Sequence, residues 1–290
     1  MTGNPSVVIT SRRGPRDLEV LTATPAVEKP GRPPLLFVHG LGHGAWCWEH
    51  WLAASAAAGY TAHALSLRGH GGSGGRLRTA RLSHFVDDVV HVAASLPRRP
   101  VLVGHSMGGL VVQQALARYA AHAGVLVAPV PAHPALGSLL SIARRHPLDA
   151  LRMMGGGSLP LRPEYLFAQL TQEEALRQAA RCGAESPLAQ YQLLFHRPPA
   201  PPRGGAPVLV LATPDDRLVP IGDVRRTARR YGATLREFPG MGHDLMLDRD
   251  WREPPLTTLL EWLPGARGPV SADPTAPAPR TPPGTPRQDG

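Results

Sequence analysis

The chain has 290 residues, of which 42% are hydrophobic, so it is long enough to bury one large core or two smaller ones. Its 31 basic and 22 acidic residues give a formal net charge of +9, which arginine carries because Lys29 is the only lysine. Since these arginines are scattered, with no dense run interleaved with aromatic residues, the charge does not indicate nucleic-acid binding.

The N-terminal segment, residues 1–28, is polar and contains several prolines, and it lacks the continuous apolar run of a signal peptide. The sequence contains no stretch that approaches the ~20 apolar residues needed to cross a bilayer, so we expect no stable membrane insertion. Cys47 and Cys182 show neither metal-ligand spacing nor a disulfide framework, and free thiols are expected. Together these features predict a cytoplasmic protein.

Short apolar runs then alternate with longer stretches whose spacing is typical of helices. Buried strands are predicted at Leu35–His39, Thr61–Leu67, Val101–His105, Val125–Ala128 and Val208–Ala212. Such alternation predicts an α/β fold, in which a mostly parallel central sheet is flanked by helices. Two earlier segments, near Ser6–Ser11 and Asp17–Thr22, are expected to add an antiparallel edge to this sheet.

The longest gap between predicted strands lies between Pro129 and Pro207, and its roughly 75 residues are too many for a simple crossover. We therefore expect a core formed by residues 1–130 and 206–264, with an inserted helical cap at residues 131–205. The last segment, residues 265–290, is rich in Pro, Ala, Thr and Gly without apolar periodicity, which predicts a disordered tail.

The predicted cap carries signals for the starts of helices. Thr171 and Glu174 form a capping box that is expected to open a helix running through Cys182, and Pro163 and Pro187 lie where proline begins helices. The cap also contains large apolar residues: Met153, Met154, Tyr165, Phe167, Tyr191, Leu194 and Phe195. Some of them should join the cap to the core, and others should face a cleft beneath it.

A glycine-flanked serine follows the predicted strand Val101–His105, and the helix-compatible run Leu110–Tyr119 comes after the glycines. A serine at the tip of such a turn has a strained backbone, and the residues two positions away must be small, as Gly104 and Gly108 are. The turn also brings the helix N-terminus, with its free N–H groups, beside any oxyanion that forms. Ser106 is therefore predicted to be a nucleophile, with an ordinary glycine-rich turn as the alternative. His105 is expected to pack in the core.

A second glycine-rich segment, Gly40-Leu41-Gly42-His43-Gly44, follows the predicted strand Leu35–His39. Its amide at Leu41 and the amide of Met107 are predicted to form an oxyanion hole, because two donors can hold a carbonyl oxygen as it becomes negative. His39 is expected to hold this loop rather than transfer protons. Three tryptophans could wall the pocket or pack in the core: Trp46, Trp48 and Trp51.

A serine hydroxyl needs a histidine base whose tautomer a carboxylate fixes. Asp215 and Asp216 follow the predicted strand Val208–Ala212, at the sheet edge where α/β proteins gather their sites. His243 stands on a later loop. The predicted catalytic residues, in chain order, are Ser106, Asp216 and His243, with Asp215 as the rival acid.

The other histidines and late aspartates are not expected to act in catalysis. Surface or packing roles are expected for His84, His91, His133, His146 and His196. Asp244 and Asp248 lie too near His243 in the sequence to be expected to orient its ring.

These motifs resemble those of the α/β-hydrolase superfamily, in its serine esterase, lipase and lysophospholipase-like branch, over roughly residues 15–264. The resemblance is carried by His39-Gly40, Arg68-Gly69-His70-Gly71-Gly72-Ser73, Gly104-His105-Ser106-Met107-Gly108, Asp216-Arg217-Leu218-Val219-Pro220 and Gly242-His243. It favours Asp216 over Asp215 as the acid. The stretch His43-Gly44-Ala45-Trp46-Cys47-Trp48 is similar to the methylesterase and hydroxynitrile-lyase branch, which leaves the subfamily open.

The resemblance implies hydrolysis of a carboxylic ester, thioester or lactone of a largely apolar small molecule or lipid, through an acyl-enzyme and without a metal or organic cofactor. Two alternatives stay open: hydroxynitrile-lyase or cofactor-free peroxidase-type chemistry on the same fold, and a non-catalytic ligand-binding receptor. The run Gly69–Gly74 fits a dinucleotide-binding glycine pattern. However, no acidic residue ends a strand about 20 residues later, so no dinucleotide site is expected.

Overall fold

The computed structural model describes residues 9–27, 29–248 and 254–263 of the chain. Within these residues it contains one eight-stranded sheet with the strand order β1-β2-β4-β3-β5-β6-β7-β8. The strands are β1 (Ile9–Gly14), β2 (Leu18–Ala23), β3 (Leu35–Val38), β4 (Ala62–Leu65), β5 (Val101–His105), β6 (Ala123–Val127), β7 (Val208–Ala212) and β8 (Thr234–Glu237). Strands β3 to β8 pair in parallel, whereas β2 is antiparallel to both β1 and β4.

The predicted sheet, mostly parallel with an antiparallel edge, is therefore confirmed. Every residue of the strands β3 to β7 is buried, as expected for parallel strands covered on both faces, while the edge strand β8 is partly exposed. The bounds of β5 and β7 match the predictions, and the ends of the other predicted strands differ by at most two residues, except that β1 reaches Gly14 rather than Ser11. Residues 6–8 of the predicted first strand lie outside the described residues.

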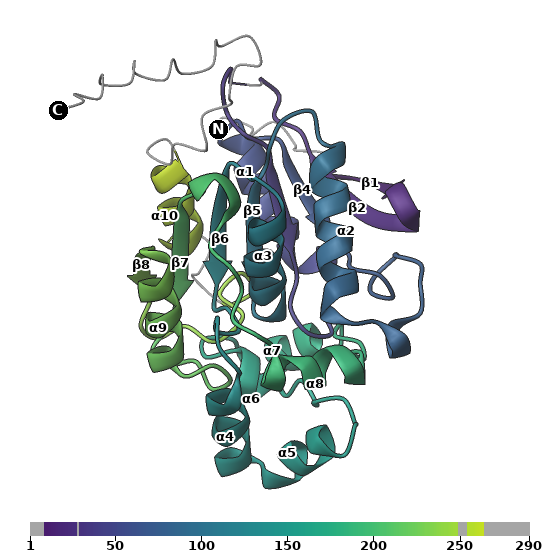
Figure 1. Cartoon of the computed structure of the whole chain (residues 1–290), viewed down its shortest axis with the longest axis vertical. Coiled ribbons are helices and arrows are strands. Elements are labelled where there is room, and N and C mark those ends of the chain that lie inside the picture. Colours follow the sequence, from purple (N-terminus) through teal and green to yellow (C-terminus); the bar gives the residue numbers. More distant parts are fainter. Residues whose placement is uncertain (1–8, 28, 249–253, 264–290) are drawn as a thin grey trace, which may run out of the picture.

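Helices cover both faces of the sheet (Figure 1). One face packs against α2 (Leu82–Ser95), α3 (Met107–Arg118) and α9 (Ile221–Tyr231), and the other packs against α1 (Glu49–Ala57) and α10 (Pro254–Trp262). Trp48 and Trp51 are fully buried in this second layer, with Phe37 of β3 5.0 Å from Trp48 between ring centroids. These two tryptophans therefore pack in the core and do not wall a pocket.

Along the chain, five α-helices come between β6 and β7. In space they lie beside the loops that follow β5 and β7 (Figure 1). They are α4 (Leu136–Arg145), α5 (Pro147–Met154), α6 (Pro163–Leu166), α7 (Gln172–Ala179) and α8 (Pro187–Phe195). The expected proline starts of α6 and α8 are confirmed, and so is the capping box of α7. The predicted division into core and cap units stays a prediction, and the predicted tail at 265–290 lies outside the described residues.

The helix α7 ends at Ala179, three residues before the predicted end at Cys182. The amides of Arg181 and Cys182 form turn bonds to residues three positions earlier, and the next amide, that of Gly183, donates to the carbonyl of Gly42 at 2.7 Å. The helical bonding is therefore already lost at Arg181, and the long-range hydrogen bond of Gly183 holds the chain that follows against the loop after β3.

The large apolar residues of the cap divide into two groups. Met153, Tyr165, Phe167 and Leu194 are buried, whereas Met154, Tyr191 and Phe195 are 47%, 50% and 54% exposed. These last three do not line the pocket at Ser106, and Tyr191 and Phe195 line a separate pocket between α8 and the start of α2. Cys47 and Cys182 are free thiols, as expected. None of the described helices is both long enough and apolar enough to span a bilayer.

Candidate active site

Ser106 is the single residue between the end of β5 and the start of α3, and its backbone angles are φ 52° and ψ −119°. L-residues rarely adopt a positive φ, so the surrounding contacts must hold this strained turn in place. A Cβ atom at Gly104 would collide with the carbonyl oxygen of Gly108, and a Cβ at Gly108 would collide with the carbonyls of Val38 and His39. The two glycines therefore allow the close approach that presents Ser106 at the tip of the turn.

Asp216 and His243 are joined directly, because the Asp216 Oδ2 atom lies 2.7 Å from His243 Nδ1. Both side chains are almost completely buried. The other carboxylate oxygen of Asp216 accepts the amides of Leu218 and Val219 at 2.8 and 2.9 Å, which fixes its orientation. The rival Asp215 is exposed and accepts a different backbone amide, so the geometry selects Asp216 as the partner of the imidazole.

The bond to Asp216 also sets the tautomer and the charge preference of His243. Because Nδ1 is the atom facing the carboxylate, it carries the hydrogen and leaves Nε2 able to accept a proton. Burial, the largest single influence, lowers the pKa of His243, but the charge and hydrogen bond of Asp216 together with the charge of Asp244 raise that pKa above its ordinary value. The ring is thus placed as a stronger base than a free histidine.

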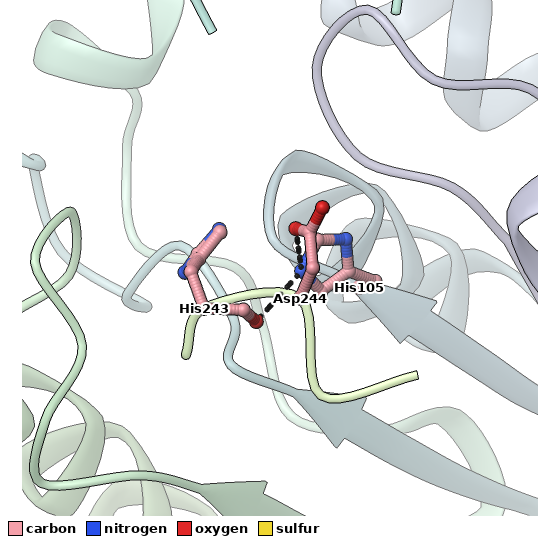
Figure 2. A group of neighbouring side chains, drawn as sticks. All are labelled: His105, His243 and Asp244. Carbon is pink, nitrogen blue, oxygen red and sulfur yellow. Dashed lines mark hydrogen bonds and ion pairs between the residues drawn. The ribbon is translucent and has the colours of Figure 1, made fainter. Parts of the chain in front are cut away.

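His105 ties the strand β5 to the loop that carries His243 (Figure 2). Its Nε2 atom lies 3.2 Å from the carbonyl oxygen of His243 and 3.4 Å from the carboxylate of Asp244. The rings of His105 and His243 are 4.8 Å apart between centroids, so the residue next to Ser106 packs against the base. Burial lowers the pKa of His105 to about 3, which makes it the neutral packing residue that was expected. The hydrogen bond between Ser106 and His243 stays a prediction.

The side chains of His105, His243 and Asp244 bring three potential metal-ligand atoms within 4.8 Å of one another. His243 already bonds Asp216 through Nδ1, and Asp244 lies 3.0 Å from His43 Nε2. These groups therefore already have protein partners, which favours a structural role over ion binding.

The loop after β3 is held by two histidines. His39 Nδ1 donates to the Gly40 carbonyl at 2.8 Å while its Nε2 accepts the Leu67 amide at 3.0 Å, and the His43 amide also donates to Gly40 at 3.3 Å. Since a trans peptide is planar, fixing the carbonyl of Gly40 turns the following N–H, that of Leu41, to the opposite side. Burial lowers the pKa of His39 well below its usual value, in keeping with this neutral tautomer.

A pocket opens at Ser106 between the core and the cap. Its walls are Leu41, Ser106, Val130, Leu218 and Val219 from the core and Ala135, Ser138, Ile142, Met153, Leu159, Gln190, Leu193 and Leu194 from the cap. The amide group of Gln190 is engaged, because it accepts the Leu159 amide at 2.8 Å and donates to the Gly157 carbonyl at 2.9 Å. The surface offered to a ligand is therefore almost entirely apolar.

Two buried ion pairs beside the site were not anticipated from the sequence. His43 Nε2 lies 3.0 Å from Asp244, and His70 Nε2 lies 3.1 Å from Glu185. Burial, the largest single influence, lowers the pKa of His43, but Asp244 and Cys182 together hold it well above its usual value. As expected, Asp244 does not orient the ring of His243. The partners are 201 and 115 residues apart in the chain, and only the glycine-rich positions of the two histidines could have hinted at them.

The sequence of residues 35–253 matches the model of a protein family described as the alpha/beta hydrolase family. A probable esterase, PIR7A from Oryza sativa subsp. indica, is 39% identical over 115 residues, which are 39% of this chain and 44% of that protein. The aligned part thus spans less than half the length of that relative. A monoacylglycerol lipase from Mycolicibacterium smegmatis is 28% identical over 233 residues, covering 74% of this chain and 82% of the lipase.

Among solved structures, a soluble variant of monoglyceride lipase from Saccharomyces cerevisiae superposes with a TM-score of 0.72 at 14% identity, covering 90% of this chain and 97% of that one. The monoacylglycerol lipase of Paleococcus ferrophilus gives a TM-score of 0.62 at 22% identity, covering 85% and 98%. At such low identities these likenesses concern the fold. With the family match over residues 35–253, they establish that the chain belongs to the alpha/beta hydrolase family.

Proposed function

We propose that this chain is a serine hydrolase that cleaves carboxylic esters of largely apolar small molecules or lipids, with Ser106, His243 and Asp216 as its triad. The observation that carries the proposal is the 2.7 Å bond between Asp216 and His243 beside the strained turn of Ser106. The esterase and lipase names of the relatives support the same reaction class.

In the proposed reaction the Ser106 hydroxyl oxygen bonds to the ester carbonyl carbon while His243 Nε2 takes the hydroxyl proton. The carbonyl oxygen becomes an oxyanion, and Asp216 stabilises the imidazolium that has formed. Collapse breaks the bond to the alcohol, which leaves with the proton from His243. Water then attacks the acyl-enzyme by the same route and regenerates Ser106. None of these steps requires a metal or organic cofactor.

The amides of Leu41 and Met107 are the proposed donors to the oxyanion. The Met107 amide opens α3, where the first N–H groups of a helix lack partners within the helix. The Leu41 amide is turned outward by the contacts of the Gly40 carbonyl. Two donors fixed before the reaction stabilise the developing charge without reorganising.

The proposed substrate preference follows from the pocket at Ser106. Its lining is mostly apolar, its one amide side chain, Gln190, is already engaged, and the Ser138 hydroxyl is the one further polar side chain beside Ser106. A charged or strongly polar acyl group would therefore lose hydration and gain few partners. An aliphatic group would instead leave water at a gain of about 0.8 kcal/mol for each buried methylene.

The proposal is tested with p-nitrophenyl esters of increasing acyl length, using wild type, Ser106→Ala and the exposed control Ser83→Ala. Wild type and Ser83→Ala should hydrolyse the series equally, while Ser106→Ala should lose at least ~10⁴-fold in kcat. Equal turnover by Ser106→Ala, or cleavage of a cyanohydrin by a wild type that hydrolyses no ester, would overturn it.

A further inference from the structure

The segment that joins α7 to α8 crosses from the cap to the loop after β3. We call residues 181–186 the strap and residues 40–44 the oxyanion loop. The strap contacts Gly42 on both of its backbone polar groups: the Gly183 amide donates to the Gly42 carbonyl at 2.7 Å, and the Gly42 amide donates to Glu185 Oε2 at 3.3 Å. A residue at the centre of the oxyanion loop is thus held by the cap.

Glu185 is a buried carboxylate with three N–H partners. Besides the Gly42 amide, Oε2 faces His70 Nε2 at 3.1 Å, and Oε1 accepts the Ser186 amide at 2.6 Å. The side chains of Glu185 and His70 are each 2% exposed. Because a buried charge is retained only where such partners surround it, Glu185 is fixed between the cap, the oxyanion loop and the loop of His70.

Other strap residues contact the same part of the core. Cys182 Sγ lies 3.6 Å from His43 Nε2, and the guanidinium of Arg181 lies 4.2 Å from the centroid of the Trp46 ring. The Ser186 hydroxyl donates to the Ala80 carbonyl at 2.7 Å. Five of the six strap residues, all except the exposed Ala184, therefore have a stated contact with the core.

These contacts bear on the direction of the Leu41 amide. On its N-terminal side, the Gly40 carbonyl is held from within the core by His39 and His43. On its C-terminal side, the Leu41 carbonyl accepts from His43 Nδ1 at 2.7 Å, and both groups of Gly42 are held by the strap. The peptide before Leu41 is thus held from the core alone, whereas the peptide after it is held by both the core, through His43, and the strap, through Glu185.

We propose that Glu185 is a positioning residue for the oxyanion hole, so that the cap supplies part of the scaffold on which the Leu41 amide is aimed. This inference rests on the proposed function. An oxyanion donor acts through its direction at the transition state, and misplacement by ~1 Å can cost ~100-fold in rate. Loosening Gly42 should therefore lower kcat more than it changes KM.

Two substitutions separate the reach of Glu185 from its charge. Glu185→Asp keeps the charge but draws the carboxylate back by the length of one carbon–carbon bond, ~1.5 Å. Glu185→Gln keeps the reach and an oxygen for the Gly42 amide but removes the charge. The matched control is Glu173→Asp, in the same cap, where the carboxylate is 81% exposed.

The measurements are kcat and KM for p-nitrophenyl butyrate, the inhibition constant of an alkyl trifluoromethyl ketone, and the unfolding temperature. The ketone forms a bond from its carbonyl carbon to Ser106 oxygen, its own oxygen becomes the oxyanion, and His243 takes the proton. Glu185→Asp should lower kcat and ketone affinity by about 10- to 100-fold with little change in KM. Glu185→Gln should keep most of both, and Glu173→Asp should match wild type.

Wild-type kcat and ketone affinity in Glu185→Asp would overturn the inference. An equal loss in Glu185→Gln would overturn it too, because the charge, and not the contact with Gly42, would then be responsible. A wild type that hydrolyses no ester and does not bind the ketone would instead refute the proposed function.

Discussion

At the scale of single residues, the proposed reaction depends on the protonation state of His243. Burial lowers the pKa of this ring, while the charge and hydrogen bond of Asp216 and the charge of Asp244 raise it, and the net result is a pKa above the ordinary 6.5. The base must be neutral to accept a proton from Ser106. Activity should therefore be present above this raised pKa and lost as the pH falls through it.

The first prediction is that kcat/KM rises with pH along a limb whose midpoint lies above 6.5, the ordinary pKa of histidine. Asp216→Asn should move the midpoint to lower pH, because the charge that raises the pKa is gone, and should lower kcat by about 10⁴-fold. Asp215→Asn, at the neighbouring exposed carboxylate, should leave the midpoint unchanged. If the midpoint shifted in Asp215→Asn and not in Asp216→Asn, the acid would be Asp215 and the proposed triad would be wrong.

A second prediction concerns Asp248, which is fully buried. Its carboxylate accepts the amides of Ala168, Gln169 and Gly242 at 3.0, 2.9 and 2.6 Å, and so joins the cap to the loop of His243. Asp248→Ala leaves these amides without that acceptor and should lower the free energy of unfolding by about 3 kcal/mol in urea titrations.

The control for this prediction is Asp87→Ala. Asp87 is 38% exposed and pairs with Arg118 at 2.8 Å, so its loss should cost at most ~1 kcal/mol. If both variants unfold at the same urea concentration, the bonds of Asp248 contribute nothing beyond an ordinary surface contact.

At the scale of elements, the close approach of α3 to the end of β3 depends on Gly108 having no side chain. A methyl group at Gly108 would meet the carbonyls of Val38 and His39, whereas one at Gly222 in α9 would meet nothing within 4 Å. Gly108→Ala should therefore lower the free energy of unfolding by at least ~1–3 kcal/mol, the cost of overpacking. Gly222→Ala, in the first turn of α9, should raise it by up to ~0.5–1 kcal/mol, because alanine has a higher helix propensity than glycine. Thermal unfolding of the two variants should give shifts of opposite sign, and shifts of equal sign would contradict the proposed close approach.

Some of these elements could be predicted from the sequence, and others could not. The strands β3, β5 and β7 were predicted within one residue, because a buried parallel strand is an unbroken apolar run that can be recognised from its own residues. The turn of Ser106 could also be predicted, because its signal lies in neighbouring residues. The bond between Gly183 and Gly42 that follows the end of α7 was not local, and neither were the pairs of Asp244 with His43 and Glu185 with His70. Contacts between distant segments leave no periodicity in either segment.

At the scale of the whole molecule, core and cap share the walls of the pocket at Ser106, so the cap should select the acyl chain. Met153 of α5 lines this pocket and is 7% exposed, while its neighbour Met154 is 47% exposed and outside it. Met153→Trp should lower kcat/KM for octanoate esters by at least ~10-fold relative to acetate esters, because the larger ring fills space that a long chain needs. Met154→Trp serves as the control and should leave that ratio unchanged. Equal ratios in the two variants would mean that the acyl chain binds elsewhere.

The central claim is that the fold activates one serine, and labelling with an alkyl fluorophosphonate followed by mass spectrometry of the intact protein and its peptides tests it most directly. The fluorophosphonate should add once to wild type, on the peptide that contains Ser106, with loss of fluoride. His243→Ala should label far more slowly, and Ser106→Ala should not label at that peptide. Labelling of another serine, or none at all in a folded wild type, would contradict the account.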